Sequence, residues 1–142
     1  MKLYVAGASA EIKRCEAFRD AAVALGCTLS ADWMAMVREV GNANHLCTDD
    51  ERREAKQLAG EGVRRCDMFV LLMPRAGMAT IGAWYELGLA ENCMCDVLLV
   101  GDAPERTVMS HGLDHISSDD EALGHLRRMM EREAPAREGA AL

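Results

Sequence analysis

The feature that most constrains the fold is an unbroken apolar run from Met68 to Met73, which follows Asp67 and ends at Pro74. A strand with one face in water alternates polar and apolar residues, and this run does not alternate. We therefore expect a central strand of a parallel sheet, covered on both faces. Parallel strands are joined by crossovers that are usually helical, so the chain must also supply helices between its strands.

The rest of the chain supplies strands and helices in alternation. Further strands are predicted over residues 2–6 and 96–100, with a weaker strand over 27–32. Helical spacing of apolar residues and two Ser/Thr-x-x-Glu capping boxes predict helices between and after these strands. The predicted helices begin at Ile12 (with a stop at Gly26), Trp33, Thr48, Thr80 and Ser118, and surface loops are predicted over 42–47 and 74–79.

This alternation predicts an α/β fold, a three-layer α/β/α sandwich with a mostly parallel five-stranded sheet of flavodoxin-like or Rossmann-like topology. We expect one domain over residues 1–133 and a flexible tail over 134–142, which is small and charged. Ligands of such folds bind beyond the carboxyl ends of the strands. The loops after Ala6, Met73 and Val100 are therefore the places to search for a site.

Charge and hydropathy exclude two classes of partner. The net charge of −7 argues against binding a nucleic-acid polymer, which needs clustered Lys and Arg, but a local site can still hold a small anion. The apolar runs are too short to cross a bilayer, and the start of the chain lacks the features of a secretory signal. We expect a cytoplasmic protein without a membrane partner.

The six cysteines do not indicate a metal site. Most fall inside apolar, periodic segments, where a reduced cysteine packs as a small hydrophobic residue. Only Cys93 and Cys95 lie close together, and neither a C-x-x-C pair nor a histidine at ligand spacing accompanies them. We therefore expect reduced packing residues rather than a disulfide framework or a zinc site.

The loop Gly7-Ala8-Ser9 after the first strand could hold an anion, since backbone N–H groups, a hydroxyl and a helix start come together there. It matches neither the dinucleotide fingerprint nor the Walker pattern. A structural turn would use the same residues, and taken alone the loop favours the turn. Tyr4, inside the strand, is expected to pack in the core with its hydroxyl bonded locally.

A second motif, Gly82 to Gly88, lies on the helix after the central strand. Its two glycines cost helix stability, which suggests close approach of a ligand or another backbone. A lone glutamate on a helix is usually solvated. Glu86, however, has Trp84 and other aromatic or apolar neighbours at the predicted binding end of the sheet, which makes it a candidate site residue.

Taken in order, these segments resemble the nucleoside 2-deoxyribosyltransferase-like family. The resemblance rests on residues 2–7, 66–74 and 82–88, followed by 97–101, and covers roughly residues 2 to 101. The family includes transferases that exchange bases between deoxynucleosides and hydrolases that cleave nucleoside 5′-monophosphates. Each motif is modest alone, and their order and spacing carry the resemblance.

The resemblance implies roles for individual residues. Glu86 would be the nucleophile that attacks the anomeric carbon of the sugar, which is chemistry that a carboxylate performs in retaining glycosidases. Tyr4 would hold that carboxylate by a hydrogen bond. Gly7, Ala8 and Ser9 match the region that contacts the 5′-phosphate in the monophosphate hydrolases.

The resemblance also implies partners. Gly82 and Trp84 are expected beside the substrate, a nucleoside or nucleotide. The chemistry needs no cofactor. Relatives are dimers or larger homo-oligomers in which a neighbouring subunit helps to close the pocket, so we expect a homo-oligomer here.

One departure from the family pattern affects activity. The family carries an aspartate eight residues before the one that begins the central strand, and counting back from Asp67 gives Ala59. Losing the acid that assists the leaving base would lower the rate about 10²- to 10⁴-fold. Glu61 falls on the polar side of its helix, so the role does not transfer to it, whereas Asp49 or Asp50 could supply another acid.

Three functions remain open from the sequence. The leading one is cleavage or transfer at the N-glycosidic bond of a nucleoside or nucleoside 5′-monophosphate through a glycosyl-Glu86 intermediate. The alternative is a catalytically weak or inactive nucleotide-binding module, because of Ala59. A structural or regulatory partner protein that retains only the fold is the third. Among the four histidines, only the segment His111 to His115 is placed near the expected pocket, at its edge.

Overall fold

The run that begins at Met68 forms the centre of the sheet in the computed structural model, which describes residues 1–40, 48–75, 81–101 and 112–133. Strand β3 (Met68–Leu72) is buried at all five of its residues and pairs in parallel with a strand on each side. The order is β2-β1-β3-β4-β5, and every pairing is parallel. The other strands are β1 (Lys2–Ala6), β2 (Thr28–Leu29), β4 (Asp96–Val100) and β5 (Asp114–Ile116).

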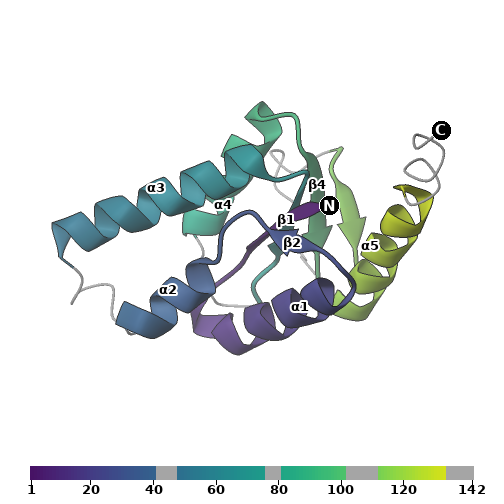
Figure 1. Ribbon diagram of the computed structural model, residues 1–142, viewed down its shortest axis with the longest axis horizontal. Helices are drawn as coiled ribbons and strands as arrows, with labels where there is room; N and C mark the ends of the chain where they lie inside the picture. The colour runs from purple at the N-terminus through teal and green to yellow at the C-terminus, as the bar shows by residue number, and fades with distance from the viewer. Residues whose placement is uncertain (41–47, 76–80, 102–111, 134–142) are drawn as a thin grey trace, which may run out of the picture.

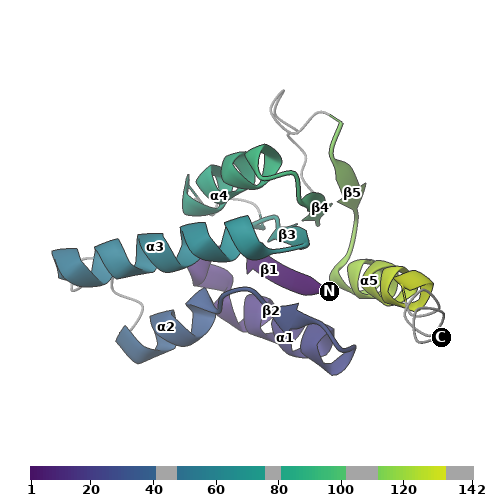
Figure 2. The same cartoon turned by 45° about the horizontal axis from the view of Figure 1, so that its top comes forward.

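Helices cover both faces of this sheet, which confirms the predicted three-layer α/β/α fold with flavodoxin-like strand order. Helices α3 and α4 lie on one face, and α1 and α5 lie on the other (Figures 1 and 2). No helix in the described ranges is both long and apolar enough to pass through a bilayer. The helical elements are η1 (Ser9–Glu11), α1 (Ile12–Ala24), α2 (Trp33–Val40), α3 (Asp49–Arg65), α4 (Ile81–Asn92) and α5 (Asp119–Glu133).

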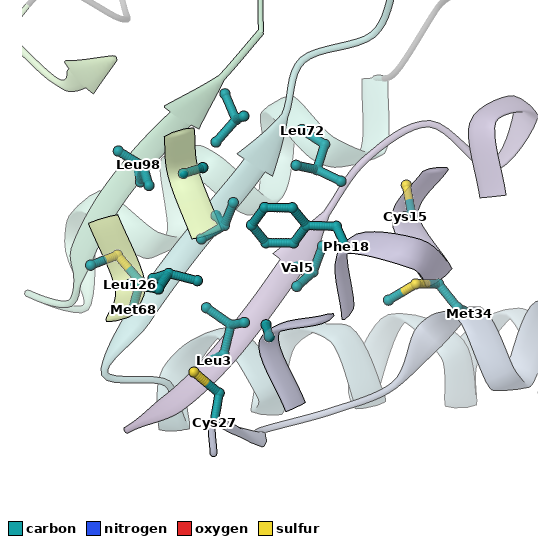
Figure 3. Close-up of a cluster of buried hydrophobic side chains, with 14 of the residues drawn as sticks. Leu3, Val5, Cys15, Phe18, Cys27, Met34, Met68, Leu72, Leu98 and Leu126 are labelled. Atoms are coloured by element: carbon teal, nitrogen blue, oxygen red, sulfur yellow. The ribbon is translucent and has the colours of Figure 1, made fainter. Parts of the chain in front are cut away.

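Alternate residues of β1, β3 and β4 contribute to two hydrophobic cores, one on each side of the sheet. The first core joins the sheet to α1 and α5, and Figure 3 shows Phe18 among strand residues such as Val5 and Leu72. The second joins it to α3 and α4. Its buried members are Tyr4, Ala6, Val63, Cys66, Phe69, Leu71, Met73, Ala83, Leu87, Ala90 and Leu99.

Local sequence signals set the ends of the helices. Thr48 begins α3 with a complete capping box, in which its hydroxyl accepts from the Glu51 N–H at 3.2 Å and its own N–H donates to the Glu51 carboxylate at 2.7 Å. Helix α1 ends before Gly26, whose φ of +101° favours glycine. At α5 the Ser118 hydroxyl caps the Glu121 N–H, but the Glu121 carboxylate accepts from Ser117 instead.

The predicted elements agree with the structure except at the edges of the sheet. The weak strand over 27–32 shortens to two residues, and the sequence did not locate β5, which is short and begins with Asp-His. The predicted loop over 42–47, most of the loop over 74–79 and the tail over 134–142 lie outside the described residues. All five described cysteines are free thiols, and three of them are buried.

One glycine permits the close contact between α3 and the sheet. A Cβ on Gly62 would lie 2.5 Å from the Cβ of Ala31 and 2.9 Å from the Tyr4 ring, distances that real Cβ atoms do not adopt. Helix α3 therefore rests directly on the buried ring of Tyr4. The absence of a side chain at this position sets the distance between the helix and β1.

Gly62→Ala should therefore destabilise the protein by about 1 to 3 kcal/mol, the usual cost of overpacking, although alanine favours helix by about 1 kcal/mol. Gly124→Ala in α5 is the matched control, because its Cβ would make only an ordinary contact of 3.5 Å. Urea unfolding of both variants measures the difference. Equal or greater stability of Gly62→Ala would contradict the close packing of α3 on Tyr4.

Candidate active site

A hydrogen bond between a strand residue and a helix residue lies at the centre of the candidate site. The Tyr4 hydroxyl of β1 donates to Glu86 Oε1 of α4 at 2.9 Å. Tyr4 is fully buried, and its ring stacks on Phe69 of β3 with centroids 5.7 Å apart and an interplanar angle of 5°. The donor is thus fixed by the core, and it fixes one oxygen of the Glu86 carboxylate.

Burial sets the protonation of this pair. It raises the pKa of Glu86 to about 7, and the hydrogen bond from Tyr4 opposes that rise because it stabilises the carboxylate. Burial, together with the Glu86 charge, raises the pKa of Tyr4 far above its ordinary value. Tyr4 therefore stays a hydrogen-bond donor at every physiological pH, while Glu86 changes charge near neutrality.

Glu86 faces a cavity of about 570 Å³, a size typical of small-molecule sites. The cavity lies at the carboxyl end of β1, between the loop after that strand and helices α2, α3 and α4. Helices α2 and α3 extend side by side past the sheet (Figures 1 and 2). The lining residues are Gly7, Ala8, Ser9, Trp33, Met36, Val37, Ala55, Lys56, Ala59, Gly60, Ile81, Gly82, Ala83, Tyr85, Glu86 and Leu89.

Most of the residues predicted from the sequence come together here. Glu86 and Gly82 line the cavity from α4, opposite the loop Gly7 to Ser9, and Tyr4 lies behind Glu86. Trp84 does not line the cavity. It packs instead against the second core, on the other side of its helix from the site.

The two glycines predicted for the site, Gly7 and Gly82, differ in their surroundings. A Cβ on Gly7 would lie 2.5 Å from the Cys15 sulfur, so glycine allows α1 to begin close behind β1. Gly82 has no neighbour within 4 Å of a Cβ among the described atoms, and its surface is open to the cavity. Gly7 is thus required by packing, and only Gly82 has free space in front of it.

Position 59, where the resemblance predicts an aspartate, has no carboxylate. Ala59 lines the cavity, but Asp49 and Asp50 do not; they are strongly exposed and pair with Arg52 and Arg53. The suggested replacement of the acid by Asp49 or Asp50 is therefore wrong for the described arrangement. Glu61 likewise points away from the cavity and bonds Gln57 and Arg65.

Trp33 and Lys56 are among the lining residues that sequence reasoning missed. Trp33 begins α2 immediately after β2, and its indole N–H donates to the Val5 carbonyl at 2.7 Å, which fixes the ring at the cavity. Lys56 lies one helical turn before Ala59 on α3. Two sequence features could have identified them as site residues. Trp33 follows the carboxyl end of a strand, and Lys56 shares a helix face with Ala59.

Arg14 joins α1 to α5 and to the end of β3. Its guanidinium donates two hydrogen bonds to Asp119 of α5, at 2.9 and 2.7 Å, and a third to the Met73 carbonyl at 2.7 Å. Next to it, the Glu11 carboxylate accepts from the Arg75 N–H at 3.2 Å and lies 3.5 Å from the Arg75 Nε. These bonds hold the loop after β3 against the start of α1.

His115, from the histidine segment expected at the pocket edge, does not line this cavity. His115 lies in β5 and borders a separate groove of about 670 Å³ beside α5, whereas His111 falls outside the described residues. The suggestion that His115 lines the site is therefore wrong. Within the described ranges, no group of three or more His, Cys, Asp or Glu side chains could hold a metal ion.

No protein-family model and no curated protein sequence matches the chain. Among solved structures, the chain is similar to a CMP N-glycosidase from Clostridium botulinum, BcmB. The TM-score is 0.61, the identity is 16%, and the match covers 89% of this chain and 98% of the other. At this identity the likeness establishes the fold, which agrees with the α/β architecture predicted from the sequence.

The shifted pKa of Glu86 makes stability depend on pH. Because the pKa rises from 4.5 to about 7 on folding, its contribution to stability is full below pH 4.5 and is lost as the pH rises to 7. Glu86→Gln stays neutral and keeps an acceptor for Tyr4. We expect it to gain at most about 3 kcal/mol over the wild type at pH 8 and little at pH 4.5.

Urea unfolding of both proteins at the two pH values measures this gain. A difference that is the same at pH 4.5 and pH 8 would contradict a buried, titrating carboxylate at position 86.

Proposed function

We propose that the protein cleaves or transfers at the N-glycosidic bond of a nucleoside or nucleoside 5′-monophosphate. The observation that carries this proposal is the Glu86 carboxylate, held by Tyr4 at 2.9 Å in the wall of a nucleotide-sized cavity. The likeness of the fold to a CMP N-glycosidase supports the same reaction class. A partly buried carboxylate on a rigid helix suits attack on an electron-poor carbon.

In this mechanism Tyr4 holds Oε1 of Glu86, and Oε2 attacks C1′ of the sugar. The C1′–N bond breaks through an oxocarbenium-like transition state, which the carboxylate stabilises, and a glycosyl-Glu86 ester forms. Water then attacks C1′ from the opposite side and releases the sugar with retained configuration. A second base in place of water would give transfer.

The loop at Gly7, Ala8 and Ser9 is proposed to take the 5′-phosphate when one is present. Ser9 offers a hydroxyl, and the chain turns there into η1 and α1, where the first N–H groups of a helix lack internal acceptors. Gly82 faces this loop across the cavity without a side chain. These features support binding of the sugar phosphate at this loop.

A second copy of the chain is proposed to cover the open side of α4. Ile81 and Tyr85 both line the cavity, yet they are 84% and 63% exposed. Large apolar side chains with that exposure are typical of interfaces. A homo-oligomer would cover them and narrow the entrance.

Ala59 favours a second candidate function, a module that binds a nucleotide and turns it over slowly or not at all. The cavity lacks a carboxylate at that position among the described residues. Such a module would gain thermal stability from a nucleoside 5′-monophosphate without cleaving it, and Ala59→Asp would create activity.

The reaction is tested with a panel of nucleosides and nucleoside 5′-monophosphates, with chromatography to detect free base. We expect the wild type to release base from at least one of them. The rate of Glu86→Gln should be at least about a thousandfold lower, because removal of a catalytic nucleophile lowers the rate by factors of this size. A second free base added to the reaction distinguishes transfer from hydrolysis, because only transfer joins that base to the sugar. Full activity of Glu86→Gln would rule out the mechanism.

Tyr4→Phe tests how the carboxylate is held. The rate should rise with pH as Glu86 ionises near pH 7, and removing the hydrogen bond should move this rise to higher pH, because the bond lowers the pKa of Glu86. Phenylalanine keeps the stacking on Phe69. The pH profile of kcat measures the shift, and a rise at an unchanged pH would argue against a hydrogen bond that stabilises the nucleophile.

A further inference from the structure

We propose that Lys56 stabilises the departing base, taking the place of the carboxylate that position 59 lacks; this inference rests on the proposed function. Cleavage of an N-glycosidic bond leaves an electron pair on the base. A group that neutralises this charge lowers the barrier in the same way as a hydrogen-bond donor at a developing oxyanion. Among the described residues, Lys56 is the cavity's one basic side chain.

The cavity has two chemically different kinds of wall. The loop Gly7 to Ser9 offers polar groups, whereas α2 and α3 line the cavity mainly with apolar side chains. The apolar wall contains Trp33, whose ring is fixed by its bond to Val5. A flat base fits against it because a fixed indole face provides a stacking surface. The apolar residues are Trp33, Met36 and Val37 of α2 with Ala55 and Ala59 of α3.

Lys56 belongs to this apolar wall of the cavity. It comes from α3, directly after Ala55 and one turn before Ala59 and Gly60, whose small size leaves the cavity wall open at this point. A lysine stem can lie along such an apolar wall with its ammonium free to reach an edge of the base. Pyrimidines and purines both carry acceptor atoms on that edge.

Three of the other four cations of α3 are engaged elsewhere. Arg52 and Arg53 pair with Asp49 and Asp50, and Arg65 pairs with Glu61, all outside the cavity. The fourth, Arg64, lies beside Gly60 and is not among the residues that line the cavity. No such ion pair holds Lys56 within the part of the chain that the structure describes. The one α3 cation that faces the cavity therefore has its charge available for a ligand.

A role at the phosphate is less suited to Lys56. The loop that would take a phosphate joins β1 to η1. Glu11, two residues beyond Ser9, pairs with two cations there, Arg14 and Arg75. Lys56 lies with the apolar residues of α2 and α3 instead. This placement favours the base over the phosphate as its partner.

Glu86 Oε2 forms a bond to C1′, the C1′–N bond breaks, and its electron pair goes to the base, whose negative charge the Lys56 ammonium neutralises by a hydrogen bond. Water then hydrolyses the glycosyl ester, returns Glu86 as a carboxylate and gives up a proton. The leaving base takes up that proton from solvent, so Lys56 ends in its starting state.

Lys56→Met tests the proposal, because it keeps the length of the stem and removes the charge. Two substrates are compared: a nucleotide that the wild type cleaves, and its analogue with an activated base, a 5-fluoropyrimidine or a 7-methylpurine. We expect kcat for the ordinary base to fall about 10²- to 10³-fold and kcat for the activated base to fall less than about tenfold. Lys13→Met, an exposed change on α1, is the control and should act as the wild type.

Each contrary outcome has a separate meaning. An equal loss of kcat on both substrates would overturn a role at the leaving base, and a rise in KM confined to 5′-phosphorylated substrates would assign Lys56 to the phosphate. Glu86→Gln should abolish cleavage of both substrates; if it does not, the proposed mechanism fails rather than the role of Lys56. If the wild type releases no base, the proposed function fails and the role of Lys56 with it.

Discussion

The hydrogen bond from Tyr4 to Glu86 is the interaction on which the rest of the site depends, because it joins the buried sheet to a helix at the cavity wall. Placing a carboxylate there costs stability, and a fixed donor offsets part of that cost while it orients the group. The core supports the donor on two sides. Phe69 stacks on its ring, and Gly62 allows α3 to close over it.

The position of this site follows from the order of the strands. In an order of β2-β1-β3-β4-β5, the connections that leave β1 and β3 turn to opposite faces of the sheet, and a crevice opens between them. The loop after β1 supplies polar groups, the helix after β3 supplies Glu86, and α2 and α3 close the sides. The same topology that covers both faces of β3 therefore creates a cavity with a polar wall and an apolar wall.

The fold was predictable because its signals are local. The apolar run of β3, the capping box at Thr48 and the stop at Gly26 each act within a few residues, whereas β5 depends on pairing with β4 and carries little apolar signal of its own. The site was less predictable. A family resemblance pointed to Glu86 and Tyr4, but Trp33 and Lys56 reach the cavity only through helix packing, which spacing along the chain does not reveal.

The central claim is that Glu86 forms a covalent bond with the sugar. It is tested most directly by incubating the protein with a nucleotide carrying fluorine at C2′, which slows hydrolysis of a glycosyl ester because it destabilises the oxocarbenium-like transition state. Mass spectrometry of the digested protein then locates any adduct. We expect the mass of the fluorinated sugar phosphate on the peptide that contains Glu86, together with one equivalent of free base. Base release without an adduct, or an adduct on another residue, would contradict the account.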